Sequence, residues 1–573
     1  MSKGSITWLT EPASVSSVNG TLHTSIYLRT ATHSIAGANF TTRALNGTIP
    51  GPTLRLHPGD TLIIDFYNAL QPGTDSEYRH NEYSAPDESN LHFHGLHVSG
   101  ELPSDDVTMS VAPGQRYRYI TKLPKDHMPG IHFLHPHRHG STSLQVGGGA
   151  AGAIIVEDTA GIKNLLPDPI SSAREFVLVV QEMNFKELDK ISRKAGDITV
   201  SLVKPEIIDM SSINFDRKFY LTNGQVEPSL LVQPNEWVRL RIIHAGWLEG
   251  DLKLQIPGCE MLLIAKDGVY LPRLPRKIKQ AELVNAGRAD IMVRCPFDKG
   301  VNSYSLASNN QRCFLSKNRR LSILNLVQHR DNITDSAVVP PRPEVRRKPK
   351  RQKQKAPENE SQENDSNMLD DLSMDSLVSG SVSMQFPEYL QDLRSALVTP
   401  GCSCTTRIRM LRYPRKEGEY FHETVQGAVV ERHIQTGIHP FHQHVHPFQL
   451  IDGVSSKKDS AEYYKVGDWH DTISGKVTVR FRPTVFTGKM MVHCHILVHE
   501  DTGMMGVEYI HNATDAATCK CNEFFPKFNA AALGVVALPA ILWLQWRRKA
   551  RSRWMSCTTR ERREPVAIEF ALN

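Results

Sequence analysis

Four histidine pairs, each with one residue between the two histidines, constrain the fold of this chain more than any other feature. In a β-strand, residues i and i+2 point to the same face, so each pair presents two imidazoles side by side. Eight imidazoles that converge on one place need a positive charge between them, and imidazole is a ligand of copper, iron and zinc. The spacing therefore predicts a metal cluster carried by β-strands. The pairs are His92 and His94, His135 and His137, His442 and His444, and His493 and His495.

The 573 residues are enough for three or four domains, and their pattern is typical of β-structure. Residues 46–70 alternate turn signals with short β-branched and aromatic runs, and a similar sequence returns at 223–243. The histidine pairs occur only in the first and last thirds of the chain. We therefore expect an all-β chain of three domains with the pairs in the outer two. The predicted domains are residues 1–159, 160–335 and 389–522.

Two segments differ in composition from these domains. Residues 336–388 are highly charged and too polar to order themselves, so we interpret them as a disordered linker. The alternative for its basic run, 345–355, is a nuclear-localisation or anionic-surface patch. Residues 526–547 contain a long apolar run, and residues 548–573 form a basic tail. This pattern predicts a single transmembrane helix, with a buried helix as the alternative.

The membrane interpretation also predicts a topology. A basic flank faces the cytoplasm, which would leave the large domains on the extracellular or luminal side. Residues 1–10 contain no apolar run, so no signal peptide is visible. An incomplete N-terminus would reconcile the two observations, and a cytosol-facing tail anchor is the other explanation. The positive charge is concentrated in two local runs, residues 345–355 of the linker and the start of the tail, so we expect no nucleic-acid partner.

Cysteines and glycosylation sequons are compatible with an oxidising compartment. Cys402 and Cys404 lie at one end of the third domain and Cys519 and Cys521 at the other, so disulfides between these pairs could join its two ends. The other cysteines leave an odd number, and their pairing stays open. Seven N-x-S/T sequons suit a secreted glycoprotein. They begin at Asn19, Asn39, Asn46, Asn332, Asn359, Asn364 and Asn512.

Cys494 indicates a second metal site. Because it lies between His493 and His495 in a strand, its side chain points to the opposite face and cannot share their cluster. His499 and Met504 follow at five and ten residues, and His439 lies upstream. Two histidines, a cysteinate and a methionine are the ligands of a blue-copper electron-transfer site, whereas zinc sites favour more cysteines at CxxC spacing.

These motifs resemble the four copper motifs of the multicopper oxidases, the laccase-like family, and are closer to bacterial-type members. The resemblance covers roughly residues 40–515 apart from the linker. It implies three cupredoxin-like Greek-key β-barrels, with a copper cluster between the first and the third. The motifs are HFHG (92–95), HPHRHG (135–140), HPFHQH (439–444), WHDT (469–472) and HCHILVHEDTGMM (493–505).

The resemblance also implies a role for each ligand and four copper ions per chain. Cys494 would bind a mononuclear blue copper, and the histidine pairs would bind a trinuclear cluster. The blue copper would be held by His439, Cys494, His499 and the axial Met504; the lone copper of the cluster by His92 and His442; and its paired coppers by His94, His135, His137, His444, His493 and His495.

By the same resemblance, a reducing substrate gives single electrons to the blue copper, and dioxygen is reduced to water at the cluster. That reduction consumes protons, and carboxylates near the cluster are the usual relays. Glu500 matches an acidic position of bacterial-type relatives, and Asp105 or Asp106 could serve from the first domain. The alternative is that these acids are surface charges.

We therefore expect a copper-dependent oxidase that acts on phenolic or other aromatic reductants. A first alternative keeps the same copper core but oxidises a metal ion such as Fe(II), Mn(II) or Cu(I), and a ferroxidase of this kind would work beside a permease in the membrane. An acidic patch next to His439 or His499 would distinguish it. A non-catalytic copper-binding protein is a third hypothesis, and the complete ligand set argues against it.

Overall fold

The structure is a computed structural model in which β-strands predominate over a few short helices. It describes residues 6–73, 77–197, 199–203, 218–297, 301–308, 321–328, 381–454, 461–514 and 517–522. The predicted transmembrane helix 526–547, the tail 548–573 and residues 336–380 of the predicted linker lie outside these ranges. Within them, none of the helices has the length and apolar character needed to cross a membrane.

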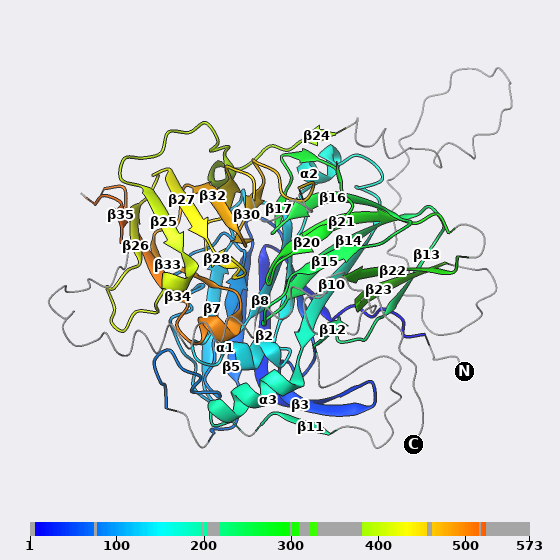
Figure 1. Ribbon diagram of the computed structural model, residues 1–573, viewed down its shortest axis with the longest axis horizontal. Helices are drawn as coiled ribbons and strands as arrows, with labels where there is room; N and C mark the ends of the chain where they lie inside the picture. Colours follow the sequence, from blue (N-terminus) through cyan, green and yellow to red (C-terminus); the bar gives the residue numbers. More distant parts are fainter. Residues whose placement is uncertain are drawn as a thin grey trace, which may run out of the picture. The chain divides into compact units, whose positions relative to one another are not determined.

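The described residues up to Asn522 form one compact unit, and the three domains named below are those predicted from the sequence. The first of them contains most of two five-stranded sheets, in the order β1-β4-β9-β8-β6 and β11-β3-β2-β5-β7 (Figure 1). Ile26, Leu62 and Phe66 from one sheet pack against Leu54 and Leu134 from the other. The burial of these alternate residues holds the two sheets together. The elements are β1 (Ser14–Ser16), β2 (Thr21–Ile35), β3 (Ala38–Leu45), β4 (Thr53–Leu56), β5 (Thr61–Asn68), β6 (His92–His94), β7 (Arg116–Lys122), β8 (Gly130–His135), α1 (Thr142–Gly147), β9 (Gly152–Val156) and β11 (Ser201–Val203).

The second domain also has two sheets, one with the order β12-β10-β14-β21-β16-β17 and β19 beside β16, the other β13-β23-β22-β15-β20. Ile131 and Phe133 of β8 pack against Val177 and Ile243, which joins the first domain to the second. The elements are α2 (Ala160–Leu165), β10 (Arg174–Met183), α3 (Phe185–Lys194), β12 (Phe219–Thr222), β13 (Ser229–Val232), β14 (Trp237–Ala245), β15 (Leu252–Gln255), β16 (Glu260–Lys266), β17 (Val269–Tyr270), β18 (Arg273–Leu274), β19 (Arg276–Lys277), β20 (Ala281–Leu283), β21 (Arg288–Arg294), β22 (Ser303–Ser308) and β23 (Leu321–Gln328).

The third domain, yellow to orange in Figure 1, has sheets in the order β25-β27-β32-β29-β30 and β31-β28-β33-β34-β26-β35. Ile434, Phe448 and Val479 of the first sheet share a core with Val492 and Cys494 of the second. The elements are β24 (Val382–Ser383), η1 (Glu388–Leu390), β25 (Ser403–Arg407), η2 (Ile408–Met410), β26 (His422–Val425), β27 (Val430–Gln435), β28 (Phe441–Gln443), β29 (Phe448–Leu450), β30 (Trp469–His470), β31 (Thr472–Ile473), β32 (Lys476–Phe481), β33 (Gly488–Cys494), α5 (Leu497–Glu500), β34 (Met505–His511) and β35 (Lys520–Cys521).

Two strands cross the domain boundaries expected from the sequence. β11 lies beyond residue 159 but pairs antiparallel with β3, so it extends a sheet of the first domain. β24 falls in the range assigned to the linker, 336–388, yet it pairs with β18 of the second domain. Both strands are only two or three residues long. Sheets pair by backbone hydrogen bonds, so such short additions leave little trace in side-chain patterns.

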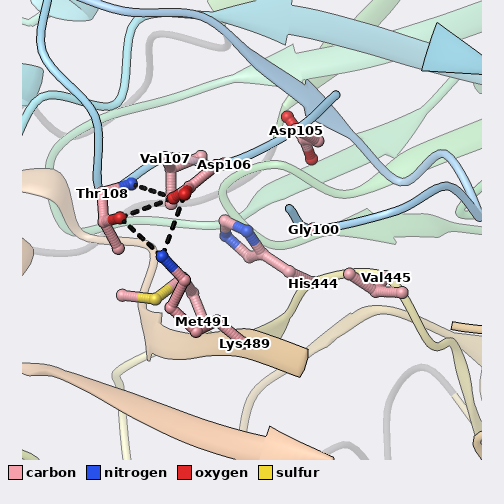
Figure 2. Close-up of a pocket in the computed structure, with 9 residues that line it drawn as sticks. All are labelled: Gly100, Asp105, Asp106, Val107, Thr108, His444, Val445, Lys489 and Met491. Carbon is pink, nitrogen blue, oxygen red and sulfur yellow. Dashed lines mark hydrogen bonds and ion pairs between the residues drawn. The ribbon is translucent and has the colours of Figure 1, made fainter. Parts of the chain in front are cut away.

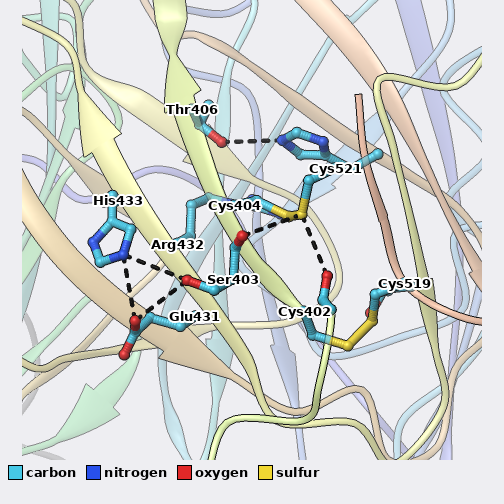
Figure 3. Close-up of a disulfide and its surroundings, with 12 residues drawn as sticks. Cys402, Ser403, Cys404, Thr406, Glu431, Arg432, His433, Cys519 and Cys521 are labelled. Atoms are coloured by element: carbon cyan, nitrogen blue, oxygen red, sulfur yellow. Dashed lines mark hydrogen bonds and ion pairs between the residues drawn. A yellow bond between two sulfur atoms is a disulfide. The ribbon is translucent and has the colours of Figure 1, made fainter. Parts of the chain in front are cut away.

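Three disulfides join the described cysteines, and two of them link the ends of the third domain as the sequence predicts. Cys402 pairs with Cys519 and Cys404 with Cys521, each across 117 residues (Figure 3). Cys259 pairs with Cys295 in the second domain, which the sequence left open. Among the described residues Cys494 is the free cysteine, and it is buried.

Removing the two disulfides of the third domain should have a non-additive effect on stability. Replacing all four cysteines with serine should cost about 4 to 5 kcal/mol, because it frees a long closed loop in the unfolded chain. Breaking either disulfide alone should cost about 2 kcal/mol or less, because the other still closes nearly the same loop. Denaturant unfolding of the copper-free protein measures these values.

The paired variant Cys259→Ser/Cys295→Ser is the control, because it breaks a disulfide in the second domain that closes a shorter loop of 36 residues. A single variant of the third domain that is as unstable as the quadruple variant would contradict the prediction.

Candidate metal centre

Two pairs of neighbouring strands bring the histidine pairs together. β6 lies antiparallel to β8 with His92 opposite His135, and β28 lies antiparallel to β33 with His442 opposite His493. The two strand pairs belong to the first and third domains, and their histidines meet face to face. The His92 ring stacks on His444 with centroids 3.9 Å apart, and the His94 ring stacks on His442 at 3.8 Å.

The eight imidazoles form one buried cluster. The Nε2 atom of His493 lies 3.1 Å from Nε2 of His137 and 3.2 Å from Nε2 of His444. Several groups of three nitrogens lie within 4.8 Å of one another, and most of these groups draw on both domains. Each of the eight histidines exposes at most a few per cent of its surface. The structure therefore brings together all eight histidines that the sequence assigns to the cluster.

Burial lowers the pKa values of these histidines, and the inward nitrogens of several of them lack hydrogen-bond partners. Burial lowers the pKa of His135 to about 4 and of His493 to about 3, and the pKa values of the other six also lie below the usual range. The inward atoms without a hydrogen bond include Nε2 of His92, His135 and His442 and both ring nitrogens of His495. Unpaired buried nitrogens are costly, and metal ions would satisfy them, so the donor set fits copper.

The outer nitrogens of three rings fix the direction of the inner ones. Nδ1 of His135 lies 2.9 Å from the carbonyl oxygen of Pro136, and Nδ1 of His442 lies 2.9 Å from that of Asp471. Nδ1 of His493 contacts the carbonyl of Cys494. Donation of Nδ1–H to a carbonyl leaves the Nε2 lone pair free to bind a metal.

Cys494 lies on the opposite face of β33, as its place between two histidines predicts. It pairs in register with Phe441, whereas its neighbour His493 faces His442. Its Sγ lies 3.5 Å from Nδ1 of His439 and 3.8 Å from Nδ1 of His499, and these two nitrogens are 3.1 Å apart. The three atoms form a second potential metal site.

Met504 lies beside this second site. Its carbonyl accepts a hydrogen bond from the Cys494 N–H at 3.0 Å, and its own N–H donates to His499. Its side chain packs against the hydrophobic core that contains Cys494. Burial raises the pKa of the Cys494 thiol above its usual range, so in the metal-free protein the thiol keeps its proton. Metal binding would displace that proton.

The three carboxylates predicted as proton relays have different surroundings. Glu500 is fully buried, its oxygens have no hydrogen-bond partner, and Oε1 lies 3.9 Å from Nδ1 of His137. Burial raises its pKa to about 8. Asp105 lies 2.9 Å from Nδ1 of His92 and accepts the Phe93 N–H, so it orients a cluster ligand. Asp106 pairs instead with Lys489 at 2.9 Å and does not contact a cluster histidine.

Asp471 and Arg288 are two functional residues that sequence reasoning did not assign. The Arg288 guanidinium donates to both carboxylate oxygens of Asp471, at 2.7 and 2.5 Å, and both residues are buried. The Asp471 carboxylate lies 3.6 Å from Nε2 of His94. Asp471 belongs to the WHDT motif, which was a signal for its importance. Arg288 comes from β21 of the second domain, and nothing in its local sequence marks it.

Asp501 and Arg409 were also missed. The Asp501 carboxylate accepts hydrogen bonds from the N–H groups of Gly140, Thr142 and Ser143, at 2.8, 3.1 and 2.7 Å, and so ties the start of α1 to the third domain. Arg409 is exposed, and its Nε donates to Nε2 of His439 at 3.1 Å. A guanidinium therefore covers the outer edge of one ligand of the thiolate site.

Comparisons with known proteins agree with this geometry. Two family models, both described as multicopper oxidase, match residues 78–161 and 415–513. The multicopper oxidase mco of Staphylococcus haemolyticus is 25% identical over 473 residues, which cover 81% of this chain and 83% of the relative. The laccase of Bacillus subtilis is 24% identical over 504 residues, or 80% of this chain and 88% of the relative.

Solved structures show the same fold. A multicopper oxidase of Pediococcus acidilactici has a TM-score of 0.59 at 19% identity and covers 89% of this chain and 93% of that one. A multicopper oxidase of Campylobacter jejuni, described as a metallo-oxidase, has a TM-score of 0.57 at 21% identity and covers 88% and 95%. Both matched regions contain buried histidine pairs, so the family models, the relatives and the geometry of the site together support the multicopper oxidase family for this chain.

Proposed function

We propose that the protein couples the one-electron oxidation of small phenolic or aromatic reductants to the four-electron reduction of dioxygen to water. The observation that carries this proposal is the position of Cys494 between His493 and His495, at the end of β33. The thiolate site and the histidine cluster are thereby joined through the backbone of adjacent residues. Bound copper would supply one-electron transfer at the first site and dioxygen reduction at the second.

Each site is held by its own set of side chains. His439, Cys494, His499 and Met504 would bind the mononuclear copper, and the eight clustered histidines would bind the other coppers. His499 is half-buried whereas the cluster histidines are fully buried, so a donor molecule can approach the edge of His499. Burial of the cluster keeps the donor away from it.

We infer that Glu500 supplies protons to the cluster. Its buried Oε1 lies 3.6 Å from Nδ1 of His139 and 3.9 Å from Nδ1 of His137, and no hydrogen bond holds its proton elsewhere. A carboxylic acid in this position can donate a proton when negative charge develops beside it.

Arg409 favours organic reductants over metal ions as substrates. An oxidase of Fe(II) or Mn(II) would need negative charge where the cation docks. The charged group that contacts Nε2 of His439 is instead the Arg409 guanidinium. A cation at this edge repels metal ions and attracts phenolates and aromatic carboxylates.

The thiolate site is tested by Cys494→Ser. The variant should lose the intense blue absorption of the copper-loaded protein, lose the copper ion of that site and consume no oxygen with a phenol, because the serine hydroxyl is a poor copper ligand. Absorption spectra, copper analysis and an oxygen electrode measure the three outcomes.

The control for this test is Cys404→Ser/Cys521→Ser, which removes two cysteines outside both sites and should keep the blue colour. A loaded wild-type protein without blue absorption, or a Cys494→Ser variant that turns over normally, would contradict the proposed function.

The role of Glu500 is tested by Glu500→Gln. This change keeps the size of the side chain but removes its acidic proton, so oxygen-dependent turnover should fall about a hundredfold. Reduction of the blue copper by a phenol without oxygen should stay unchanged, because the donor reacts at the other site. Stopped-flow spectroscopy separates the two steps, and an equal loss in both would show that the variant perturbs the structure instead.

Substrate choice is tested by Arg409→Glu. Reversing the charge beside His439 should shift the ratio of kcat/KM for Fe(II) to that for an anionic phenolic acid by about tenfold toward Fe(II) at low ionic strength. Lys416→Glu, which changes another exposed cation, is the control. An unchanged ratio would remove the support that Arg409 gives to organic substrates.

A further inference from the structure

A small hollow lies against the cluster on the side of His444. Its volume is about 10 Å³, and Asp105, Asp106, Thr108, His444 and Lys489 contribute to its lining (Figure 2). That volume has room for about one water molecule. Asp105 and His444 connect it to the cluster, because Asp105 bonds His92 and His444 stacks on the same ring.

A much larger cleft lies on the outer side of Lys489. Its volume is about 370 Å³, and it shares Thr108 and Lys489 with the hollow as lining residues. Tyr413, Arg138 and Lys416 line other parts of it. The side chains of Thr108 and Lys489 are therefore common to both spaces.

The Lys489 side chain is held in place by the first domain. It projects from β33 of the third domain, and its Nζ lies 2.9 Å from Oδ2 of Asp106 and 3.1 Å from Oγ1 of Thr108, as Figure 2 shows. Glu101 accepts the Lys489 backbone N–H at 2.7 Å, which fixes the strand at this point. The backbone is thus anchored, and the side chain is held by polar contacts at its tip.

These tip contacts can break at little cost. The Lys489 side chain is 23% exposed, so water can reach its ammonium group and replace its contacts with Asp106 and Thr108. A lysine stem has four rotatable bonds and can swing into the cleft without moving the backbone.

We propose that the Lys489 side chain is a movable gate between the cleft and the hollow, and that dioxygen, water and small anions pass it to reach the His444 side of the cluster. The inference rests on the proposed function and names the residue that controls access to its dioxygen-reducing site. The gate is closed while Asp106 and Thr108 hold Nζ. It opens when these contacts exchange for water.

The test uses the copper-loaded protein and two small probes. Azide association with the oxidised protein and reoxidation of the fully reduced protein by dioxygen are both followed by stopped-flow absorption. Azide is charged and dioxygen is neutral, so the pair separates an open passage from a change in electrostatic attraction. Binding of azide is also a measurement that does not depend on turnover.

Lys489→Ala should speed both reactions about tenfold or more, because it removes the gate. Lys489→Arg keeps the ion pair and the bulk and should leave both rates within about twofold of wild type. Lys416→Ala, on the lining of the cleft, is the matched control and should change neither. Rates for Lys489→Ala within twofold of wild type, or a change for azide alone, would overturn the proposal.

Asp106→Asn provides a second variant if Lys489→Ala does not fold. It weakens the hold on Nζ but keeps the lysine, so both rates should rise, and unchanged rates would again overturn the gate. Failure of the gate is distinguishable from failure of the proposed function. The gate is contradicted when the azide and dioxygen rates of the variants equal those of the wild type. The proposed function is contradicted when the wild-type protein consumes no oxygen with any phenol.

Discussion

The burial of eight imidazoles, several of whose inward nitrogens have no hydrogen-bond partner, is the constraint on which the rest of the structure depends. Each such nitrogen costs free energy in a water-excluded interior. The first and third domains each contribute half of the rings, so the cost arises where two domains meet. A polypeptide that keeps this arrangement needs rigid support around it and a cation within it. The carbonyls that hold Nδ1 of His135 and His442 are part of that support.

None of the described residues of the second domain is among the candidate metal ligands, yet this domain supports the cluster through charge. Arg288 reaches from β21 to Asp471, which lies beside His94. A further buried pair, Lys266 with Asp468 at 2.7 Å, joins the same two domains nearby. Buried pairs of this kind add little net stability, but breaking one partner is costly. They therefore fix how the second and third domains dock and keep the wall of the cluster in one position.

Sequence reasoning found the parts of the site that follow from strand periodicity. The period of two places His493 and His495 on one face and Cys494 on the other, and the structure has this arrangement. It could not find Arg288, Arg409 or Lys489, because their partners lie in other domains or far along the chain. Adjacency in sequence also misled the prediction for Asp106. It follows Asp105 directly, but Asp105 contacts His92 whereas Asp106 contacts Lys489. The extra strands β11 and β24 were missed because backbone pairing alone defines them.

One strand, β33, has a consequence for how this chain can vary. Within the seven residues Gly488–Cys494 it carries Lys489 at one end and His493 and Cys494 at the other. Inserting or deleting a single residue between them would exchange the two faces and turn Cys494 toward the cluster and its histidine neighbours toward the core. We therefore expect changes of length to be tolerated outside the strand and not within it. The length of β33 fixes the distance from Lys489 to both metal sites. Substitutions can therefore change the passage beside Lys489 or the path of electrons through Cys494, but insertions and deletions in the strand would disrupt both.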